Sequence, residues 1–171
     1  MEDRTATEWP ADMGQLDLRI GEIESVEEHP NADKLIILQV NIGESKRQLV
    51  AGLKKHYSAQ DLVSKKIVIL CNLQPAKLRG VESQGMLLAA VKDDEVSILI
   101  PVGEAKAGDK IRGTFGHGGL LSFPEFKKMR IEIGTDGYAE FVGPDGGRFQ
   151  LHTSTGRIKP DRPMLQGARI E

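Results

Sequence analysis

The apolar residues of this chain stand in short runs divided by turn residues, and this pattern favours strands over long helices. The run KIVILC at 66–71 is continuous and rich in β-branched residues, which is typical of a buried strand. Residues 16–26 alternate imperfectly, and the slip of register around Gly21 predicts a bulge or coil in a long strand. Further strands are predicted at 34–42, 48–51, 86–91, 96–100 and 110–114.

One short helix interrupts these strands. Ser58 has the character of an N-cap and is followed by AQDL, so one or two helical turns are predicted between the third and fourth strands. Short strands, a single small helix and frequent turns favour a closed or nearly closed barrel over a βαβ sheet. A five-stranded barrel with its helix in this place is the OB-fold arrangement, which commonly binds single-stranded or looped nucleic acids on one face.

The chain divides into three parts. Residues 1–13 show no periodicity and are predicted to form a flexible arm, and residues 14–115 form the barrel. Residues 116–171 are too few for a large core of their own, so we expect a smaller α+β extension that packs on the barrel. Within it we predict a helix at 123–133 and strands at 138–142, 148–152, 156–158 and 167–170. The predicted fold is therefore mainly β.

Composition narrows the function classes. No segment approaches the ~18 apolar residues of a membrane span, and the acidic N-terminal residues resemble neither a signal nor a transit peptide. The single Cys71 cannot form an internal disulfide and fits a small buried hydrophobe. We expect a cytoplasmic protein without membrane association.

The usual catalytic motifs are missing from the sequence. It contains no P-loop and no Gly-x-Ser-x-Gly elbow, and its four histidines have no ligand spacing. We therefore expect no catalytic residue, no metal and no cofactor, and a chain that is not itself an enzyme.

Charge is distributed unevenly although the net charge is only −2. Residues 62–81 contain four cations and no acid, which is enough to meet a few phosphates without making the whole surface adhesive. The alternative is a solvated, lysine-rich edge. The four cations are Lys65, Lys66, Lys77 and Arg79.

The segment 71–90 combines these charges with turn residues. An extended backbone there would place Lys77 and Arg79 on one side and Leu78 on the other, and Gly80 permits a bend. Ser83 follows before the next buried strand. Two cations and a hydroxyl on one edge of a barrel are suited to holding a phosphodiester and touching neighbouring bases.

Three ordered motifs in the barrel resemble the tRNA-binding domain family: LDLRIGEIESVEEHPNADKL (16–35), RQLVAGL (47–53) and NLQPAKLRGVESQGMLLAA (72–90). That family includes structure-specific bacterial tRNA-binding proteins and the appendix of many methionyl-tRNA synthetases. The resemblance implies an OB-fold that binds tRNA by its shape, whichever amino acid the tRNA carries.

The C-terminal motifs PEFKKMRIEI (124–133), YAEFVGPDGGRFQL (138–151) and QGARIE (166–171) are similar to the extension of the endothelial-monocyte-activating polypeptide II type. In that branch, which includes the appendix of animal tyrosyl-tRNA synthetases, the extension packs where the short bacterial proteins place a second subunit. The resemblance implies a monomer with a pseudo-dimer interface, and a homodimer is the alternative.

The family resemblance implies specific contacts with tRNA. Lys77 and Arg79 are expected to meet phosphates, and Ser83 to bond a sugar or phosphate oxygen. Met86 would lie against a base or ribose, or else pack in the core. The loop of Asn31 and Lys34 would face the nucleic acid, although Asn31 also suits a turn. Five further cations are expected as outer phosphate contacts, although each could equally be a surface charge without a role in binding: Arg47, Lys54, Lys55, Lys65 and Lys66. The extension could add Lys127, Lys128 and Arg130.

These residues point to a non-catalytic tRNA-binding cofactor, or an appended domain of an aminoacyl-tRNA synthetase, that raises the local tRNA concentration. The expected partners are tRNA and a synthetase. The alternative is a protein-interaction or cytokine-like signalling module with secondary RNA binding. RIGEIES (19–25) matches the stretch known from cytokine-active relatives, and its simplest role here is the first barrel strand, with Gly21 as its close-approach position.

Overall fold

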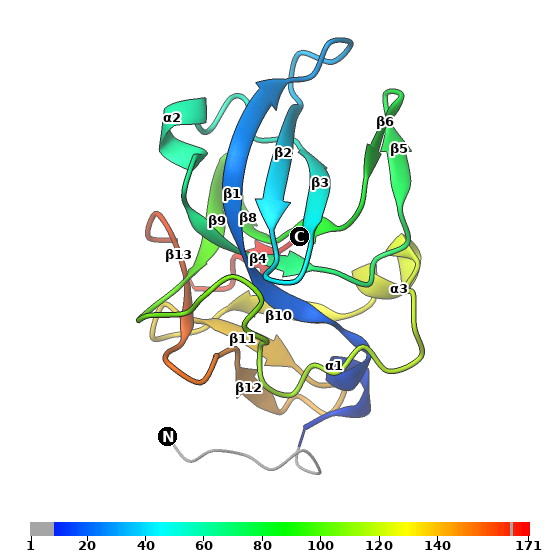
Figure 1. Ribbon diagram of the computed structural model, residues 1–171. Coiled ribbons are helices and arrows are strands. Elements are labelled where there is room, and N and C mark those ends of the chain that lie inside the picture. Colours follow the sequence, from blue (N-terminus) through cyan, green and yellow to red (C-terminus); the bar gives the residue numbers. More distant parts are fainter. Residues whose placement is uncertain (1–8, 165) are drawn as a thin grey trace.

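The computed structural model describes residues 9–164 and 166–171, and its first half forms a nearly closed barrel (Figure 1). One antiparallel sheet has the order β3-β2-β1-β4-β7. The predicted helical turn is present between β3 and β4, where the Ser58 and Asp61 side chains each bond the other's backbone N–H. The elements are β1 Leu18–Glu28, β2 Ile36–Asn41, β3 Lys46–Ala51, α2 Ala59–Leu62, β4 Lys66–Leu70 and β7 Met86–Leu87.

The second half of the chain extends the barrel through a curled sheet of order β12-β11-β10-β14-β8-β9-β13. The β14–β8 and β13–β9 ladders join the extension to the barrel directly. The predicted mainly β fold, a five-stranded barrel with a packed extension, is confirmed. The elements are β8 Ala89–Lys92, β9 Glu95–Pro101, α3 Phe123–Lys127, β10 Arg130–Ile133, β11 Ala139–Val142, β12 Arg148–Gln150, β13 Ile158–Pro160 and β14 Arg169–Ile170.

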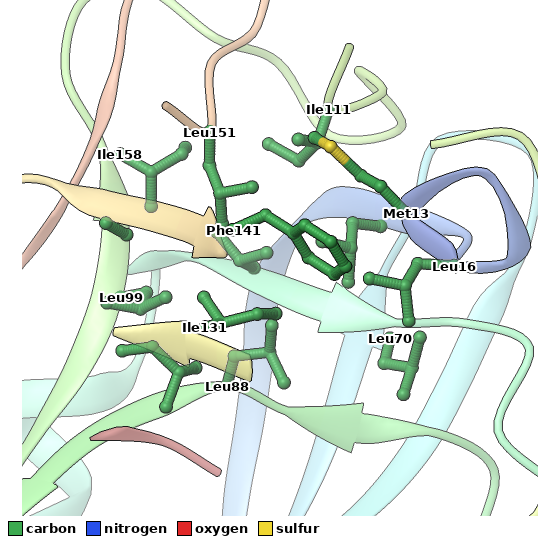
Figure 2. Close-up of a cluster of buried hydrophobic side chains, with 14 of the residues drawn as sticks. Met13, Leu16, Leu70, Leu88, Leu99, Ile111, Ile131, Phe141, Leu151 and Ile158 are labelled. Atoms are coloured by element: carbon green, nitrogen blue, oxygen red, sulfur yellow. The ribbon is translucent and has the colours of Figure 1, made fainter. Parts of the chain in front are cut away.

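Two hydrophobic cores share the strand β4. Ile67 and Ile69 belong to the core inside the barrel, whereas Val68 and Leu70 belong to the core between barrel and extension. Figure 2 shows this second core, in which Phe141 of the extension lies among side chains from both parts. Successive residues of a strand face opposite sides, so burial of both faces requires the continuous apolar run that the sequence shows.

The structure corrects several sequence predictions. The bulge of β1 lies between Ile23 and Ser25, not at Gly21. The predicted close approach at Gly21 is confirmed, since a Cβ there would lie 2.5 Å from Ile69 Cδ1. The strand predicted at 110–114 is only a single bridge between Lys110 and Arg19.

Two further elements differ from the prediction. The helix predicted at 123–133 ends at Lys127 and is followed by β10, which pairs with β11. The strand predicted at 86–91 divides at Leu88, because β7 pairs with β4 whereas β8 pairs with β9 and β14.

The predicted flexible arm, residues 1–13, falls partly outside the described residues, which begin at Trp9. The helix α1 spans Ala11–Gln15, and Met13 is fully buried in the core between barrel and extension. The prediction is therefore wrong at Ala11–Met13, where the core provides a site for an apolar side chain. In the described part of the chain, no helix has the length and apolar character to cross a membrane.

Candidate nucleic-acid interface

The segment with the two expected phosphate contacts folds as a hairpin of β5 Ala76–Leu78 and β6 Val81–Ser83, which stands beside the barrel in Figure 1. Arg79 and Gly80 form its turn, with φ of 52° and 89°. Two central residues with positive φ mark a type I′ turn, whose twist matches that of a hairpin. An extended backbone, the condition for placing both cations on one side, holds at Lys77 and Leu78 on β5 but not at Arg79, which lies in the turn.

The base of the hairpin is anchored to β3. Ser83 Oγ accepts a hydrogen bond from the Val50 backbone N–H at 3.0 Å and donates to the Gly85 carbonyl at 3.0 Å. The Gln84 backbone N–H donates to the Gln48 carbonyl at 2.7 Å, and the Gln48 N–H donates to Gln84 Oε1 at 3.0 Å. Ser83 is buried, so its hydroxyl holds the hairpin and does not face solvent.

Arg47 ties together the two ends of the segment that contains the hairpin. Its Nη1 donates to the carbonyls of Cys71 and Gln84, each at 2.9 Å, and the side chain is half-buried. Two backbone carbonyls thus bind Nη1 of a side chain for which the sequence predicted an outer phosphate contact. The role of these carbonyls could not be predicted from the sequence, because they lie 24 and 37 residues away from Arg47.

Lys77 and Arg79 are exposed, and neither makes an ion pair or side-chain hydrogen bond with any residue that the structure describes. Glu82 stands opposite Lys77 in the hairpin register, but its carboxylate accepts a hydrogen bond from Gln84 Nε2 at 3.3 Å. Leu78, between the two cations, is 37% exposed. The hairpin therefore offers two charges that remain available to an anion.

The loop of residues 29–35 lies against this hairpin. His29 is 6% exposed, and its Nε2 lies 2.9 Å from the Leu78 carbonyl oxygen. Asn31 and Lys34 are exposed in the same loop, and the Asn31 backbone N–H donates to His29 Nδ1 at 3.0 Å. The structure thus brings Asn31 and Lys34 to the side of the molecule that carries the hairpin. The contact of His29 could not be predicted from the sequence, because its hairpin partner is 49 residues away.

Other expected contacts are separated from the hairpin or engaged. Lys65 pairs with Asp161 of the extension at 3.0 Å, next to α2, which lies across the barrel from the hairpin (Figure 1). Lys54 pairs with Glu28 at 3.3 Å. Met86 packs partly buried against the core between barrel and extension. Lys66 is half-buried and Lys55 exposed.

The cations of the extension fall into two groups. Lys127 and Lys128 are exposed on and beside α3, with Lys127 Nζ 5.5 Å from the centre of the Phe123 ring. Arg130 instead donates from Nε to Glu132 at 3.0 Å. Burial by itself would raise the pKa of Glu132, but hydrogen bonds from Arg148 and Arg130 outweigh it, and this pKa lies below its ordinary value.

A hollow of about 330 Å³ lies between α1 and residues 113–118. Phe115 stacks on His117 there, with ring centres 5.2 Å apart, and Trp9 meets Phe115 edge-on. The lining includes no lysine or arginine, so the hollow is distinct from the cationic hairpin. Among the described residues, no cluster of His, Cys, Asp and Glu is arranged to hold a metal ion.

Comparison with known proteins identifies the family of the barrel. Residues 18–110 match the family model described as "Putative tRNA binding domain". A methionine–tRNA ligase of Thermococcus onnurineus is 55% identical over 101 residues, which are 59% of this chain. The match spans only 14% of that ligase.

Solved structures of two other proteins are similar to this chain. The C-terminal domain of Plasmodium vivax p43 has a TM-score of 0.79 and 26% identity, covering 93% of this chain and 98% of that one. The chaperone CsaA of Bacillus anthracis has a TM-score of 0.51 and 35% identity, covering 56% of this chain and 90% of that one. The barrel of this chain, with the hairpin it carries, belongs to the tRNA-binding domain family.

Proposed function

We propose that this chain binds folded tRNA without catalysing a reaction, and that the β5–β6 hairpin meets the phosphate backbone. The observation that carries the proposal is that Lys77 on β5 and Arg79 in the turn are exposed and have no ionic partner in the described part of the chain. Phosphate contacts fix the position of a protein on RNA and carry no base sequence. Recognition would therefore follow the folded shape of the tRNA.

The anchored base of the hairpin favours this role. Ser83, Gln84 and Arg47 hold the hairpin to the barrel through hydrogen bonds. A contact surface that is already ordered loses less conformational entropy on binding than a mobile loop does. We therefore assign Arg47 and Ser83 to positioning, and propose Lys77 and Arg79 as principal contacts with Asn31 and Lys34 beside them.

The remaining expected residues have weaker support as contacts. Lys54 and Lys66 are only partly exposed, and an RNA phosphate could replace Glu28 as the partner of Lys54. Lys65 and Met86 serve the contact between barrel and extension. We propose that these last two lie outside the interface.

We further propose that the chain acts as a cofactor or appended domain of an aminoacyl-tRNA synthetase. The similarity to a segment of methionine–tRNA ligases supports this role. Tethering a second tRNA-binding surface to a synthetase raises the effective tRNA concentration at its active site. The extension covers the apolar outer face of β4 and β8, which supports a monomer over a homodimer.

The test compares folded tRNA with an unstructured RNA of equal length, using fluorescence anisotropy at matched salt. The proposal expects folded tRNA to bind with a Kd of about 1 μM or less, at least roughly tenfold below the Kd for the unstructured RNA. Equal affinity for both RNAs contradicts recognition by shape. Absence of tRNA binding at low salt contradicts the proposed function itself.

A second candidate is a protein-interaction module, including a cytokine-like role, with secondary RNA binding. It is favoured by exposed apolar side chains at 115–123 and by the similarity to a protein described as a chaperone. A competition experiment separates the two candidates. If an unfolded polypeptide binds the protein without displacing tRNA, the protein has a second binding surface. The exposed side chains are Phe115 at 45%, Leu120 at 63% and Phe123 at 49%.

A further inference from the structure

We infer that His29 is a positioning residue for tRNA binding, whose Nε2–H donates to the Leu78 carbonyl and fixes the tip of the β5–β6 hairpin against the loop 29–35. The inference rests on the proposed function, because it assigns His29 a role in presenting Lys77 and Arg79. His29 would touch no RNA, since its side chain is buried.

The geometry determines which ring nitrogen carries the proton. Nδ1 lies 3.0 Å from the Asn31 backbone nitrogen, and a backbone N–H can only donate, so Nδ1 must accept. The proton of the neutral ring therefore resides on Nε2, which donates to the Leu78 carbonyl oxygen at 2.9 Å. Both ring nitrogens are satisfied, and the ring links the loop to the hairpin.

This link ties β5 to the loop 29–35, whereas within the hairpin β5 is held through its pairing with β6. The anchors at Ser83 and Gln84 lie at the end of β6 and just beyond it. Of the residues in β5, only Leu78 has a hydrogen bond outside the hairpin within the described structure, and its partner is His29. Strands of three residues are marginal by themselves. The bond to Leu78, between the two cations, thus defines where their charges lie.

Hydrogen bonds within the loop 29–35 hold His29 in place. The His29 backbone N–H donates to the Leu35 carbonyl at 3.2 Å, which closes the loop around the ring. The Asn31 N–H then orients the imidazole through Nδ1. A ring held on both sides loses little further freedom when the tip meets RNA.

Two substitutions separate the two ring nitrogens. In His29→Gln the amide nitrogen stands near the position of Nε2, so the donor to Leu78 is kept while the acceptor for Asn31 is lost. In His29→Asn the shorter side chain keeps an acceptor near Nδ1 but does not reach Leu78. We expect His29→Asn to raise the Kd for tRNA roughly three- to tenfold, the loss of one hydrogen bond, and His29→Gln to stay within about twofold of the parent protein. Equal losses in both variants, or a larger loss in His29→Gln, overturn the inference.

A double-mutant cycle distinguishes this inference from the proposed function. In a Lys77→Ala, Arg79→Ala background, His29→Asn should cause no further loss of affinity, because the charges it positions are gone. Full additivity overturns the inference. If Lys77→Ala, Arg79→Ala binds tRNA like the parent protein, the proposed contacts fail. If that variant is weakened but His29→Asn is not, only the role of His29 fails.

A spectroscopic measurement tests the tautomer without any substitution. The ¹⁵N chemical shifts of the His29 imidazole should show a protonated Nε2 and an unprotonated Nδ1 in the folded protein near neutral pH. A proton on Nδ1 overturns the inference directly. The thermal midpoints of both variants are measured as well. If His29→Asn has a folding defect, the inference is tested by His29→Gln and by the spectrum of the parent protein.

Discussion

In Arg79 the backbone conformation is unfavourable for an arginine, whereas the side chain is placed for binding. Its φ of 52° lies in the left-handed region, which costs a residue other than glycine or asparagine about 1 kcal/mol. Asparagine before glycine is the preferred pair for a type I′ turn, so the arginine is not there for the turn. Strain at a residue with an exposed, unpaired charge fits a binding role.

Replacing Arg79 by asparagine should therefore separate stability from binding. Arg79→Asn is expected to raise the free energy of unfolding by up to about 1 kcal/mol, which raises Tm by roughly 2 °C, because asparagine tolerates the turn. The same variant should weaken tRNA binding. Thermal unfolding and tRNA titration of one sample check both outcomes, and unchanged tRNA affinity contradicts a phosphate contact by Arg79.

Cys71 gives a second test at this scale. Burial raises the pKa of its thiol to about 11 from an ordinary 9.0. Because only the thiolate reacts, a rise of about two pKa units alone slows modification roughly a hundredfold near neutral pH. A thiol reagent should modify the native protein at least that much more slowly than the urea-unfolded protein. Rates within tenfold of each other would show that the barrel core is open.

At the scale of elements, features set by neighbours in sequence were predictable and features set by distant partners were not. The α2 cap is local, since Ser58 and Asp61 are three residues apart, and its prediction is confirmed. The end of α3 was missed although Met129, Ile131 and Ile133 alternate with a period of two, which is a strand signal. The division at Leu88 depends on pairing with two different sheets.

The candidate site follows the same rule. Lys77 and Arg79 could be proposed from the sequence because their charges lie close together and a glycine follows them. The turn that places Arg79 at a tip needs the pairing of Leu78 with Val81, which composition does not determine. The roles of Arg47 and His29 depend on carbonyl groups brought from elsewhere in the chain.

Gly21 tests the packing of β1 against its neighbours. A Cβ there would lie 2.5 Å from Ile69 Cδ1 and 2.6 Å from Val40 Cγ1, both in the barrel core. Gly21→Ala should lower the free energy of unfolding by roughly 1–3 kcal/mol through overpacking.

The matched control for that substitution is Gly52→Ala. Its new methyl group would meet only Leu35 Cδ2, at 4.0 Å, and its φ is not in the left-handed region. Stability should then be unchanged or rise by up to about 1 kcal/mol. Denaturant unfolding compares the two, and equal destabilisation would contradict the close approach at Gly21.

On the scale of the whole molecule, the barrel and the extension share a core and ladders, which makes them energetically dependent. Phe141 of the extension is 1% exposed and belongs to the same cluster as Leu70 and Leu88 of the barrel (Figure 2). Removing the extension would expose the apolar outer face of β4, and removing the barrel would expose the Phe141 side chain. We therefore expect one cooperative unit and not two independent domains.

Two large-to-small substitutions test this dependence. Phe141→Ala in the extension and Leu38→Ala inside the barrel should each lower the free energy of unfolding by roughly 2–5 kcal/mol. Both should shift one and the same transition, followed by far-UV circular dichroism in denaturant. A separate, earlier transition for Phe141→Ala would show that the extension unfolds by itself.

The central claim, that the tip of the β5–β6 hairpin meets tRNA phosphates, is tested most directly by the salt dependence of binding. Lys77→Ala, Arg79→Ala is compared with Lys106→Ala, Lys159→Ala, which removes the same charge from exposed lysines, one of them on β13 across the barrel (Figure 1). The hairpin variant should bind more weakly, with a slope of log K against log salt smaller by roughly 1.5 to 2. The control should keep the parent slope. An unchanged slope in the hairpin variant, or an equal fall in both, would contradict the account.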